Sequence, residues 1–161
     1  MGRLRGGADP SKPQRQQAYL RALETIPNLD IHYGRFLLTT TRMALVDPPV
    51  GGPRTPQVFK TEEKGSDVNL ASYLLLDAFD SRFDVAIVVS NDSDLSEPIR
   101  IVRERFDRPV VIFSPYQTVS YELRGVASYR KVVRRSLLAA SQFPDVLHDE
   151  HGAIFRPEEW Y

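Results

Sequence analysis

An unbroken apolar run, Phe83 to Ser90 (FDVAIVVS), constrains the fold of this chain more than any other segment. The run is rich in β-branched residues and has polar residues on both sides, which is typical of a strand buried on both faces of a parallel sheet. A helical pattern follows from Leu95 to Phe106, and after Arg108-Pro109 comes a second buried run, Val110 to Phe113. This strand–helix–strand order with short connections predicts an α/β fold with a mostly parallel sheet.

The neighbouring segments predict further elements of the same fold. Helices are expected over Gln14–Ile26, capped by Ser11, and from Asp67 to about Phe79, capped by Ser66. The expected buried side of the second helix is Leu70, Tyr73, Leu74 and Phe79. Strands are expected over Leu29–Thr41, Gln57–Thr61 and Arg130–Val133, and a brief helix over Val119–Gly125.

The length of 161 residues suits one domain that buries about two-thirds of the surface of its unfolded chain. We expect a flexible basic lead-in over residues 1–13 and a single domain over residues 14–161. That domain contains a proline- and glycine-rich loop at residues 47–56 and ends in a hairpin-like tail that turns at His151-Gly152.

Composition excludes several classes of protein. The chain has no cysteine, which excludes a disulfide scaffold, a zinc–thiolate site, an iron–sulfur cluster and a cysteine nucleophile. Its apolar runs are only a few residues long, so no membrane span is expected. No apolar segment follows the basic N-terminus, so no secretory signal is expected and the default expectation is a cytoplasmic location.

The zero net charge conceals an uneven distribution along the chain. Residues 1–60 hold nine Lys and Arg against four Asp and Glu, residues 61–94 hold two against eight, and residues 95–135 hold nine against four. An acidic centre between basic stretches suits a metal-binding carboxylate cluster with phosphate-binding residues on either side. An ordinary solvated surface explains the same composition.

Two carboxylates follow the first buried strand, in the run Ser90-Asn91-Asp92-Ser93-Asp94. Sites in open α/β sheets lie beyond the carboxyl ends of the strands. Helix capping accounts for one acidic residue, with Ser93 or Asp92 as N-cap and Asp94 in the first turn. Capping accounts less well for two acids with two further polar groups, so a structural and a functional role both stay open.

A second acidic segment, Glu62-Glu63-Lys64-Gly65-Ser66-Asp67, precedes another expected helix. Capping by Ser66 explains this segment when it is taken alone, although Gly65 permits a turn that aims Asp67 inward. If the two helix starts converge, Asp67, Asp92 and Asp94 form an all-oxygen cluster that suits Mg²⁺ or Mn²⁺. A cation is then needed because three adjacent carboxylates repel one another.

Other signatures fit the chain less well. An EF-hand loop starting at Asp92 needs glycine where Glu97 stands. Asp92-Ser93-Asp94 is similar to the Asp-x-Asp motif of haloacid-dehalogenase-type phosphatases, but no matching downstream lysine and acidic pair is found. His148-x-x-His151 has a metal-binding spacing, and a polar hairpin turn explains it better.

The two acidic segments together resemble the NYN domain family, whose members are relatives of PIN-domain nucleases. The matching motifs are Lys60-Thr61-Glu62-Glu63-Lys64-Gly65-Ser66-Asp67-Val68-Asn69-Leu70-Ala71 and Val88-Val89-Ser90-Asn91-Asp92-Ser93-Asp94-Leu95. Their order, spacing and helix–strand–helix context agree with the family, and the likeness covers most of residues 9–160. The resemblance implies a PIN-like three-layer α/β fold and metal-dependent ribonuclease activity.

The resemblance also implies roles for individual residues. Asp67, Asp92 and Asp94 would hold one or two Mg²⁺ or Mn²⁺ ions, and the metal would activate water for in-line attack on a phosphodiester. The substrate-binding residues implied are Lys60, Lys64, Ser90, Asn91, Arg130 and Arg134. A basic face of Arg124, Arg130, Lys131, Arg134 and Arg135 would track the backbone of single-stranded RNA. A solvated helix and strand edge explains this basic face equally well.

One family feature is missing from the sequence. NYN domains usually begin with a buried strand that ends in an aspartate, and nothing in residues 1–20 matches it. The expected architecture is therefore a PIN-like fold without its N-terminal strand–helix–strand portion. Three explanations fit: a truncated nuclease, a degenerate domain that binds RNA without cutting it, or a domain whose sheet is completed by a second copy or another chain.

We therefore expect a metal-dependent endoribonuclease that hydrolyses single-stranded RNA with Mg²⁺ or Mn²⁺, weakened if the first aspartate is needed. The alternatives are a non-catalytic RNA-binding or protein-interaction module and, less favoured, a haloacid-dehalogenase-like phosphatase. Binding of a divalent metal separates the enzyme from a module that binds RNA through its basic face alone.

Overall fold

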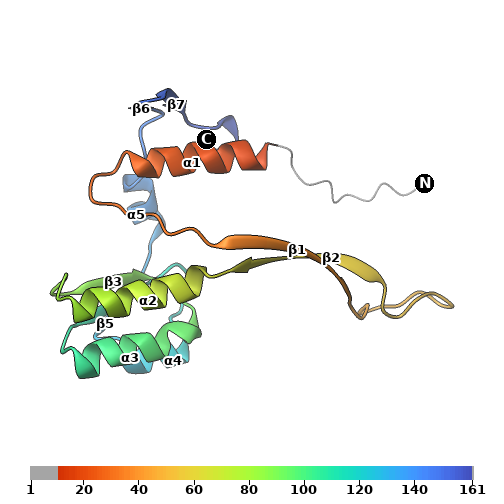
Figure 1. Ribbon diagram of the computed structural model, residues 1–161, viewed down its shortest axis with the longest axis horizontal. Helices are drawn as coiled ribbons and strands as arrows, with labels where there is room; N and C mark the ends of the chain where they lie inside the picture. Colours follow the sequence, from red (N-terminus) through yellow and green to blue (C-terminus); the bar gives the residue numbers. More distant parts are fainter. Residues whose placement is uncertain (1–10, 161) are drawn as a thin grey trace. The chain divides into compact units, whose positions relative to one another are not determined.

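The computed structural model describes residues 11–160, which form two compact units (Figure 1). One unit combines the described residues up to Ile31 with those from Arg135 onward, and the other comprises residues 32–134. Residues 1–10 of the expected flexible lead-in lie outside the described residues. The last two residues of that lead-in, Lys12 and Pro13, belong to the first helix. No helix in the described part of the chain is long and apolar enough to cross a membrane.

The larger unit is built on a three-stranded parallel sheet with the order β3–β4–β5. Its strands and helices are α2 (Ser66–Phe79), β3 (Ala86–Val89), α3 (Ser96–Arg105), β4 (Val110–Ser114), α4 (Tyr121–Val126) and β5 (Tyr129–Val132). The strand–helix–strand arrangement predicted from the two apolar runs is confirmed, and so is the α/β class of the fold.

Helices α2, α3 and α4 pack against one face of this sheet. Ile99 and Val102 of α3 meet Val110 and Ile112 of β4, and all four side chains are fully buried. Leu123 of α4 closes the same cluster. Aliphatic side chains from alternating helices and strands therefore form one continuous core, as short crossover connections require.

Burial alternates along β3, contrary to the sequence expectation. Ala86 and Val88 are buried against the helices, whereas Ile87 and Val89 are 61% and 63% exposed. The prediction that the run from Phe83 to Ser90 is buried on both faces is therefore wrong. Successive strand residues point to opposite faces, and the apolar run carried no information on whether the second face is covered.

Helix α2 buries a narrower stripe than expected. Leu74 is buried as predicted, together with Ala78. Leu70 and Tyr73 are each 40% exposed and Phe79 is 71% exposed, so the predicted burial of these three residues is wrong. The helix packs against the core through Leu74 and Ala78, and Ala71 and Leu75 are partly buried beside them.

A two-stranded antiparallel ribbon precedes α2 in the larger unit. Strand β1 (Arg35–Arg42) pairs with β2 (Gln57–Lys64), so the expected first strand begins later and the second is longer than predicted. The ribbon and its loop extend away from the sheet and helices of the unit (Figure 1). Phe36, Leu38 and Phe59 are 67%, 67% and 78% exposed, because nothing in the described chain packs on them.

The smaller unit combines α1 (Lys12–Glu24) and α5 (Arg135–Ala140) with a hairpin of β6 (Val146–Asp149) and β7 (Gly152–Phe155). A hairpin forms in the predicted tail, but its turn lies at Glu150-His151 and not at the predicted His151-Gly152, because Gly152 pairs with Asp149 as the first residue of β7. Helix α5 had no counterpart in the sequence-based expectations.

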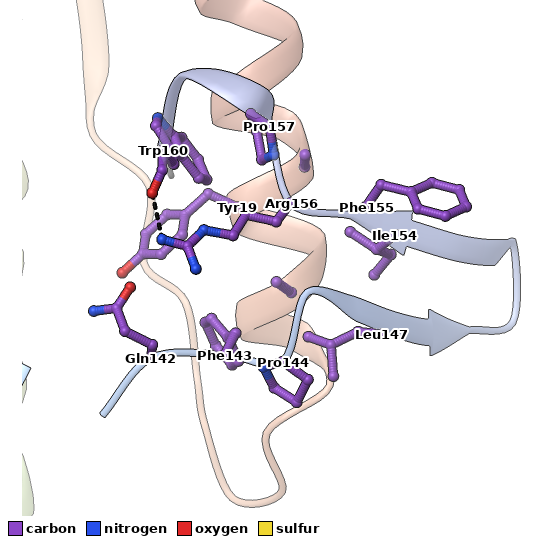
Figure 2. A pocket seen from close by; sticks show the side chains of 12 residues that line it. Tyr19, Gln142, Phe143, Pro144, Leu147, Ile154, Phe155, Arg156, Pro157 and Trp160 are labelled. Carbon is purple, nitrogen blue, oxygen red and sulfur yellow. Dashed lines mark hydrogen bonds between the residues drawn. The ribbon is translucent and has the colours of Figure 1, made fainter. Parts of the chain in front are cut away.

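A small cavity of about 90 Å³ lies in the smaller unit (Figure 2). Tyr19 forms edge-to-face contacts beside it, with ring centroids 6.4 Å from Phe143 and 6.0 Å from Trp160. The Arg156 guanidinium donates to the Trp160 carbonyl at its rim. Aromatic side chains thus provide much of the packing in this unit.

Candidate functional site

The predicted acidic residues lie at the carboxyl edge of the parallel sheet. Strand β3 ends at Val89, and Asp92 and Asp94 follow in the next loop and the short 3-10 helix Ser93–Leu95. A short turn joins α2 to β3, so α2 runs against the strand and its first turn, with Asp67, reaches the same edge. In α/β folds this edge is where ligands bind.

Hydrogen bonds within the loop fix the backbone that carries Asp92 and Asp94. The Ser90 hydroxyl accepts from the Asp92 amide at 3.1 Å, and the Asp92 Oδ1 accepts from the Asp94 amide at 3.0 Å. Asp92 is therefore the N-cap of the 3-10 helix, as one of the two sequence interpretations predicted. Capping occupies one oxygen of Asp92, and both carboxylates are exposed to solvent.

Asn91 links this loop to the next one along the sheet. Its Oδ1 accepts from the backbone amide of Ser120 at 2.8 Å, and the Ser120 hydroxyl caps α4 by accepting from the Leu123 amide at 3.3 Å. The loops that follow β3 and β4 are thus connected at the carboxyl edge. The substrate-binding role implied for Asn91 stays a prediction.

The start of α2 differs in detail from the expected cap. Gly65 is the N-cap, with a φ of 101° that favours glycine, and Ser66 is the first helical residue. The Glu63 Oε1 accepts from the Ser66 amide at 3.3 Å and from its hydroxyl at 2.7 Å. The prediction of Ser66 as N-cap is wrong by one residue, because the carboxylate of Glu63 serves the free amide instead. Asp67 stands exposed in the first turn.

Within residues 11–160, the structure contains no group of three or more His, Asp or Glu side chains that lie close enough together to hold a metal ion. Asp67, Asp92 and Asp94 share an edge of the sheet without forming one coordination sphere. Their chemistry fits Mg²⁺ or Mn²⁺, since all three offer only carboxylate oxygens, which these hard cations prefer. The three-carboxylate metal site stays a prediction.

The two lysines expected to bind substrate share a carboxylate partner. Lys60 forms a close ion pair with Glu62, and the Lys64 Nζ lies 3.4 Å from the same carboxylate. The hydrogen bond from Lys60, with the charges of both lysines, lowers the pKa of Glu62 from its ordinary value. Glu62 therefore offsets part of the positive charge that a phosphate would meet here.

Sequence reasoning missed two polar neighbours of Lys64. A shallow depression of about 270 Å³ is lined by Lys64 together with Arg35 and Asn69. Arg35 lies opposite Lys64 in the β1–β2 register, and the Asn69 Nδ2 donates to the Tyr33 carbonyl at 3.4 Å. Only the strand register reveals the first of these neighbours, because Arg35 is far from Lys64 in sequence.

The two arginines expected to bind substrate occupy different places. Arg130 lies on β5 and lines a second depression of about 290 Å³, together with Arg124 and Lys131. Arg134 follows β5, is exposed and does not line that depression. Substrate binding by either residue stays a prediction.

Comparison with known proteins places these residues in a family context. The family model of the NYN domain matches residues 46–133, which is more than half of the chain and includes both acidic segments. The chain is also 29% identical, over 167 aligned residues, to the 6-hydroxy-3-succinoylpyridine 3-monooxygenase HspA of Pseudomonas putida. That alignment covers 98% of this chain and 53% of the relative, so the chain spans about half the length of the curated protein it matches.

A solved structure is also similar to this chain. The protein, of unknown function, comes from Vibrio parahaemolyticus and is 17% identical with a TM-score of 0.47. The superposition covers 80% of this chain and 65% of the other.

Proposed function

Because the chain belongs to the NYN domain family, we propose that it is a metal-dependent ribonuclease that hydrolyses phosphodiester bonds of RNA. The observation that carries this proposal is the pair Asp92 and Asp94, exposed at the carboxyl end of β3 within the matched segment. Two solvent-exposed carboxylates on a backbone fixed by hydrogen bonds are suited to an ion that must also reach a phosphate.

In this proposal Asp92 and Asp94, joined by Asp67, would hold Mg²⁺ or Mn²⁺. When bound, the ion would supply an activated water and neutralise charge on the phosphate. The side chains of Lys64 and Arg35, which line the neighbouring depression, would bind the RNA backbone and orient it. The proposal also retains Lys60, Ser90, Asn91, Arg130 and Arg134 as substrate-binding residues.

The first test is cleavage of a labelled single-stranded RNA in the presence of Mn²⁺ or Mg²⁺. Wild-type protein is expected to cut, and Asp92→Asn and Asp94→Asn are each expected to lose about 100-fold or more in rate, because each substitution removes a charge that holds the ion. EDTA is expected to abolish cutting by the wild-type protein.

Asp80→Asn is the matched control for these variants. Asp80 is an exposed aspartate at the C-terminal end of α2, on the amino side of the sheet, so its substitution is expected to leave the rate unchanged. RNA binding without any metal-dependent cutting would contradict the ribonuclease and favour the non-catalytic RNA-binding module. Turnover of a phosphomonoester through an aspartyl-phosphate would favour the phosphatase instead.

The Pseudomonas relative supplies a second candidate function, hydroxylation of a pyridine ring. The observation that favours it is the alignment over 98% of this chain. Incubation of the purified chain with 6-hydroxy-3-succinoylpyridine, oxygen and a reduced nicotinamide or flavin tests this candidate. Oxygen consumption coupled to loss of the pyridine would support it, and no consumption would leave the ribonuclease as the better reading.

The proposal includes a second chain that completes the sheet. No described strand pairs with the outer edge of β3, and Ile87 and Val89 are exposed beside it. Free strand edges with β-branched side chains favour association. Light scattering during size-exclusion chromatography is expected to give twice the mass of one chain, and a monomer at all concentrations would contradict this part of the proposal.

A further inference from the structure

We propose that the depression lined by Arg124, Arg130 and Lys131, here called the basic depression, binds a phosphate group of the RNA strand next to the acidic loop. The inference rests on the proposed ribonuclease function and adds a defined binding site to it. The phosphate belongs either to an internal phosphodiester or to the end of the RNA, since the same donors recognise both.

The basic depression has a suitable size and position. Its volume is about 290 Å³, and Gln117 and Thr118 contribute polar lining. The Lys131 ammonium lies over the Phe113 ring, 5.6 Å from the ring centroid, so the charge of the depression is assigned to the guanidinium groups of Arg124 and Arg130. Gln117 and Thr118 follow β4, and Lys131 lies near the carboxyl end of β5, so the depression opens at the carboxyl edge. This is the same edge that carries Asp92 and Asp94.

The charge of the depression is not offset by carboxylates. In the part of the chain that the structure describes, none of Arg124, Arg130 and Lys131 forms an ion pair with Asp or Glu. Other arginines, by contrast, are held by acidic partners: Arg21 by Asp149, Arg82 by Asp77 and Arg100 by Glu97 and Glu104. A cluster of cations without acidic partners is the electrostatic pattern of an anion-binding site.

Backbone contacts hold the two guanidinium groups while leaving donors available. The Arg124 Nε donates to the Val119 carbonyl at 2.7 Å, and the Arg130 Nη1 donates to the Arg124 carbonyl at 3.2 Å. A guanidinium has five N–H donors, and these contacts use one nitrogen of each. The remaining donors match the oxygens of a phosphate, which arginine binds in a bidentate manner.

A hydrogen bond connects the basic depression with the acidic loop. The Asn91 Oδ1 accepts from the Ser120 amide at 2.8 Å, and Ser120 directly follows Val119, which lines the depression. One RNA strand can therefore place one phosphate near Asp92 and Asp94 and another in the depression. Such a contact away from the cleaved bond would fix the register of the strand.

The test measures RNA binding separately from cleavage. Fluorescence anisotropy of a short labelled RNA is recorded in EDTA over a series of salt concentrations. Arg124→Gln combined with Arg130→Gln is expected to weaken binding about tenfold and to reduce the slope of log K against log salt by about 0.7, the loss of one phosphate contact on a single strand.

Arg105→Gln is the matched control. Arg105 is an exposed arginine without an acidic partner in the described chain, and it lies at the end of α3, on the opposite edge of the sheet. Its substitution is expected to leave affinity and slope unchanged. The pair Arg124→Lys and Arg130→Lys retains the charge and is expected to keep the salt slope, which separates the loss of a phosphate contact from a loss of folding.

If affinity and salt slope are unchanged in the glutamine variant, the basic depression does not bind a phosphate of the RNA, even if the wild-type protein cuts RNA. Cleavage assays on the same samples decide the ribonuclease separately, because binding in EDTA needs no catalysis. Matched RNAs with a 5′-phosphate and a 5′-hydroxyl distinguish the two sources of phosphate. A loss of affinity in the glutamine variant for both RNAs identifies an internal phosphodiester, and a loss confined to the phosphorylated RNA identifies the terminal group.

Discussion

The two units of this chain differ in the interactions that hold each of them together. In the larger unit, Ile99, Val102 and Ile112 belong to an aliphatic core from which water is fully excluded. In the described part of the smaller unit only Ala22 and Ile154 are buried apolar residues. Its polar and aromatic contacts include the edge-to-face rings around Tyr19 and a two-fold hydrogen-bonded pair between Arg21 and Asp149, with N–O distances of 2.8 and 2.6 Å.

Because of this difference, we expect the two units to respond to different perturbations. Aliphatic burial is nearly independent of pH, whereas an arginine–aspartate pair is not. The chain also provides a selective probe, since Trp160 is the single tryptophan and lies in the smaller unit. Its fluorescence reports that unit, while circular dichroism reports the helices of both.

Removing a core side chain from the larger unit is expected to change the free energy of unfolding more than any other substitution considered below. Ile99→Ala is expected to lower the free energy of unfolding by about 2–5 kcal/mol, because it leaves a cavity between α3 and the sheet. Urea denaturation followed by circular dichroism measures this loss. Ile87→Ala is the control with the same chemistry at a position that is 61% exposed, and it is expected to cost well under half as much. Equal losses would contradict the assignment of the core to one face of the sheet.

A smaller effect, confined to the smaller unit, is expected on breaking the Arg21–Asp149 pair. The Arg21 guanidinium, hydrogen-bonded to Asp149, holds the pKa of that carboxyl at about 2 against an ordinary value of 3.8. Its contribution to stability is therefore complete above the ordinary pKa and is lost as the pH falls from about 4 to about 2.

At neutral pH, Arg21→Gln is expected to lower the midpoint temperature of unfolding that Trp160 fluorescence reports. Near pH 2 the midpoint temperatures of the variant and the wild-type protein are expected to become equal. Thermal unfolding monitored by Trp160 fluorescence at several pH values measures both. Lys12→Gln is the control, because it also removes a positive charge from α1, at an exposed position that has no ion pair with a described carboxylate. It is expected to change neither the midpoint at neutral pH nor its dependence on pH. A constant difference between wild type and Arg21→Gln across this pH range would contradict the role of the pair.

The smallest effect is expected in the β1–β2 ribbon. Phe59→Ala removes a large side chain that is 78% exposed, so the free energy of unfolding of the isolated chain is expected to change by no more than about 0.5 kcal/mol. Urea denaturation at low protein concentration measures this change. A loss as large as that of Ile99→Ala would show that the ribbon is covered by another molecule in solution.

Local sequence patterns predicted most elements, and they failed where a second surface was needed. The strands and helices from Ser66 to Val132 follow the predicted order, because apolar runs and polar turns encode them locally. The exposure of Ile87 and the short extent of β1 were not predictable in this way. Both depend on which other segments cover a strand, and neighbouring residues carry no signal of that.

The candidate site shows the same division. The sequence identified Asp67, Asp92 and Asp94, and chain direction brings them to one edge of the sheet. It did not identify Arg35 beside Lys64 or the contact between Asn91 and Ser120. These arise from strand register and from the meeting of two loops that are far apart in the sequence. The extent of the domain, from residue 14 to residue 161, stays a prediction.

The family, the α/β class and the acidic residues follow from the amino-acid sequence alone, because periodicity, turn residues and short motifs are local properties of the chain. The three-dimensional fold was needed to show which face of the sheet is buried and which described cations lack a carboxylate partner. It was also needed to show that Arg124 and Arg130 line one depression near the acidic loop. Burial and charge pairing depend on side chains brought together through space, and a one-dimensional pattern does not record those neighbours.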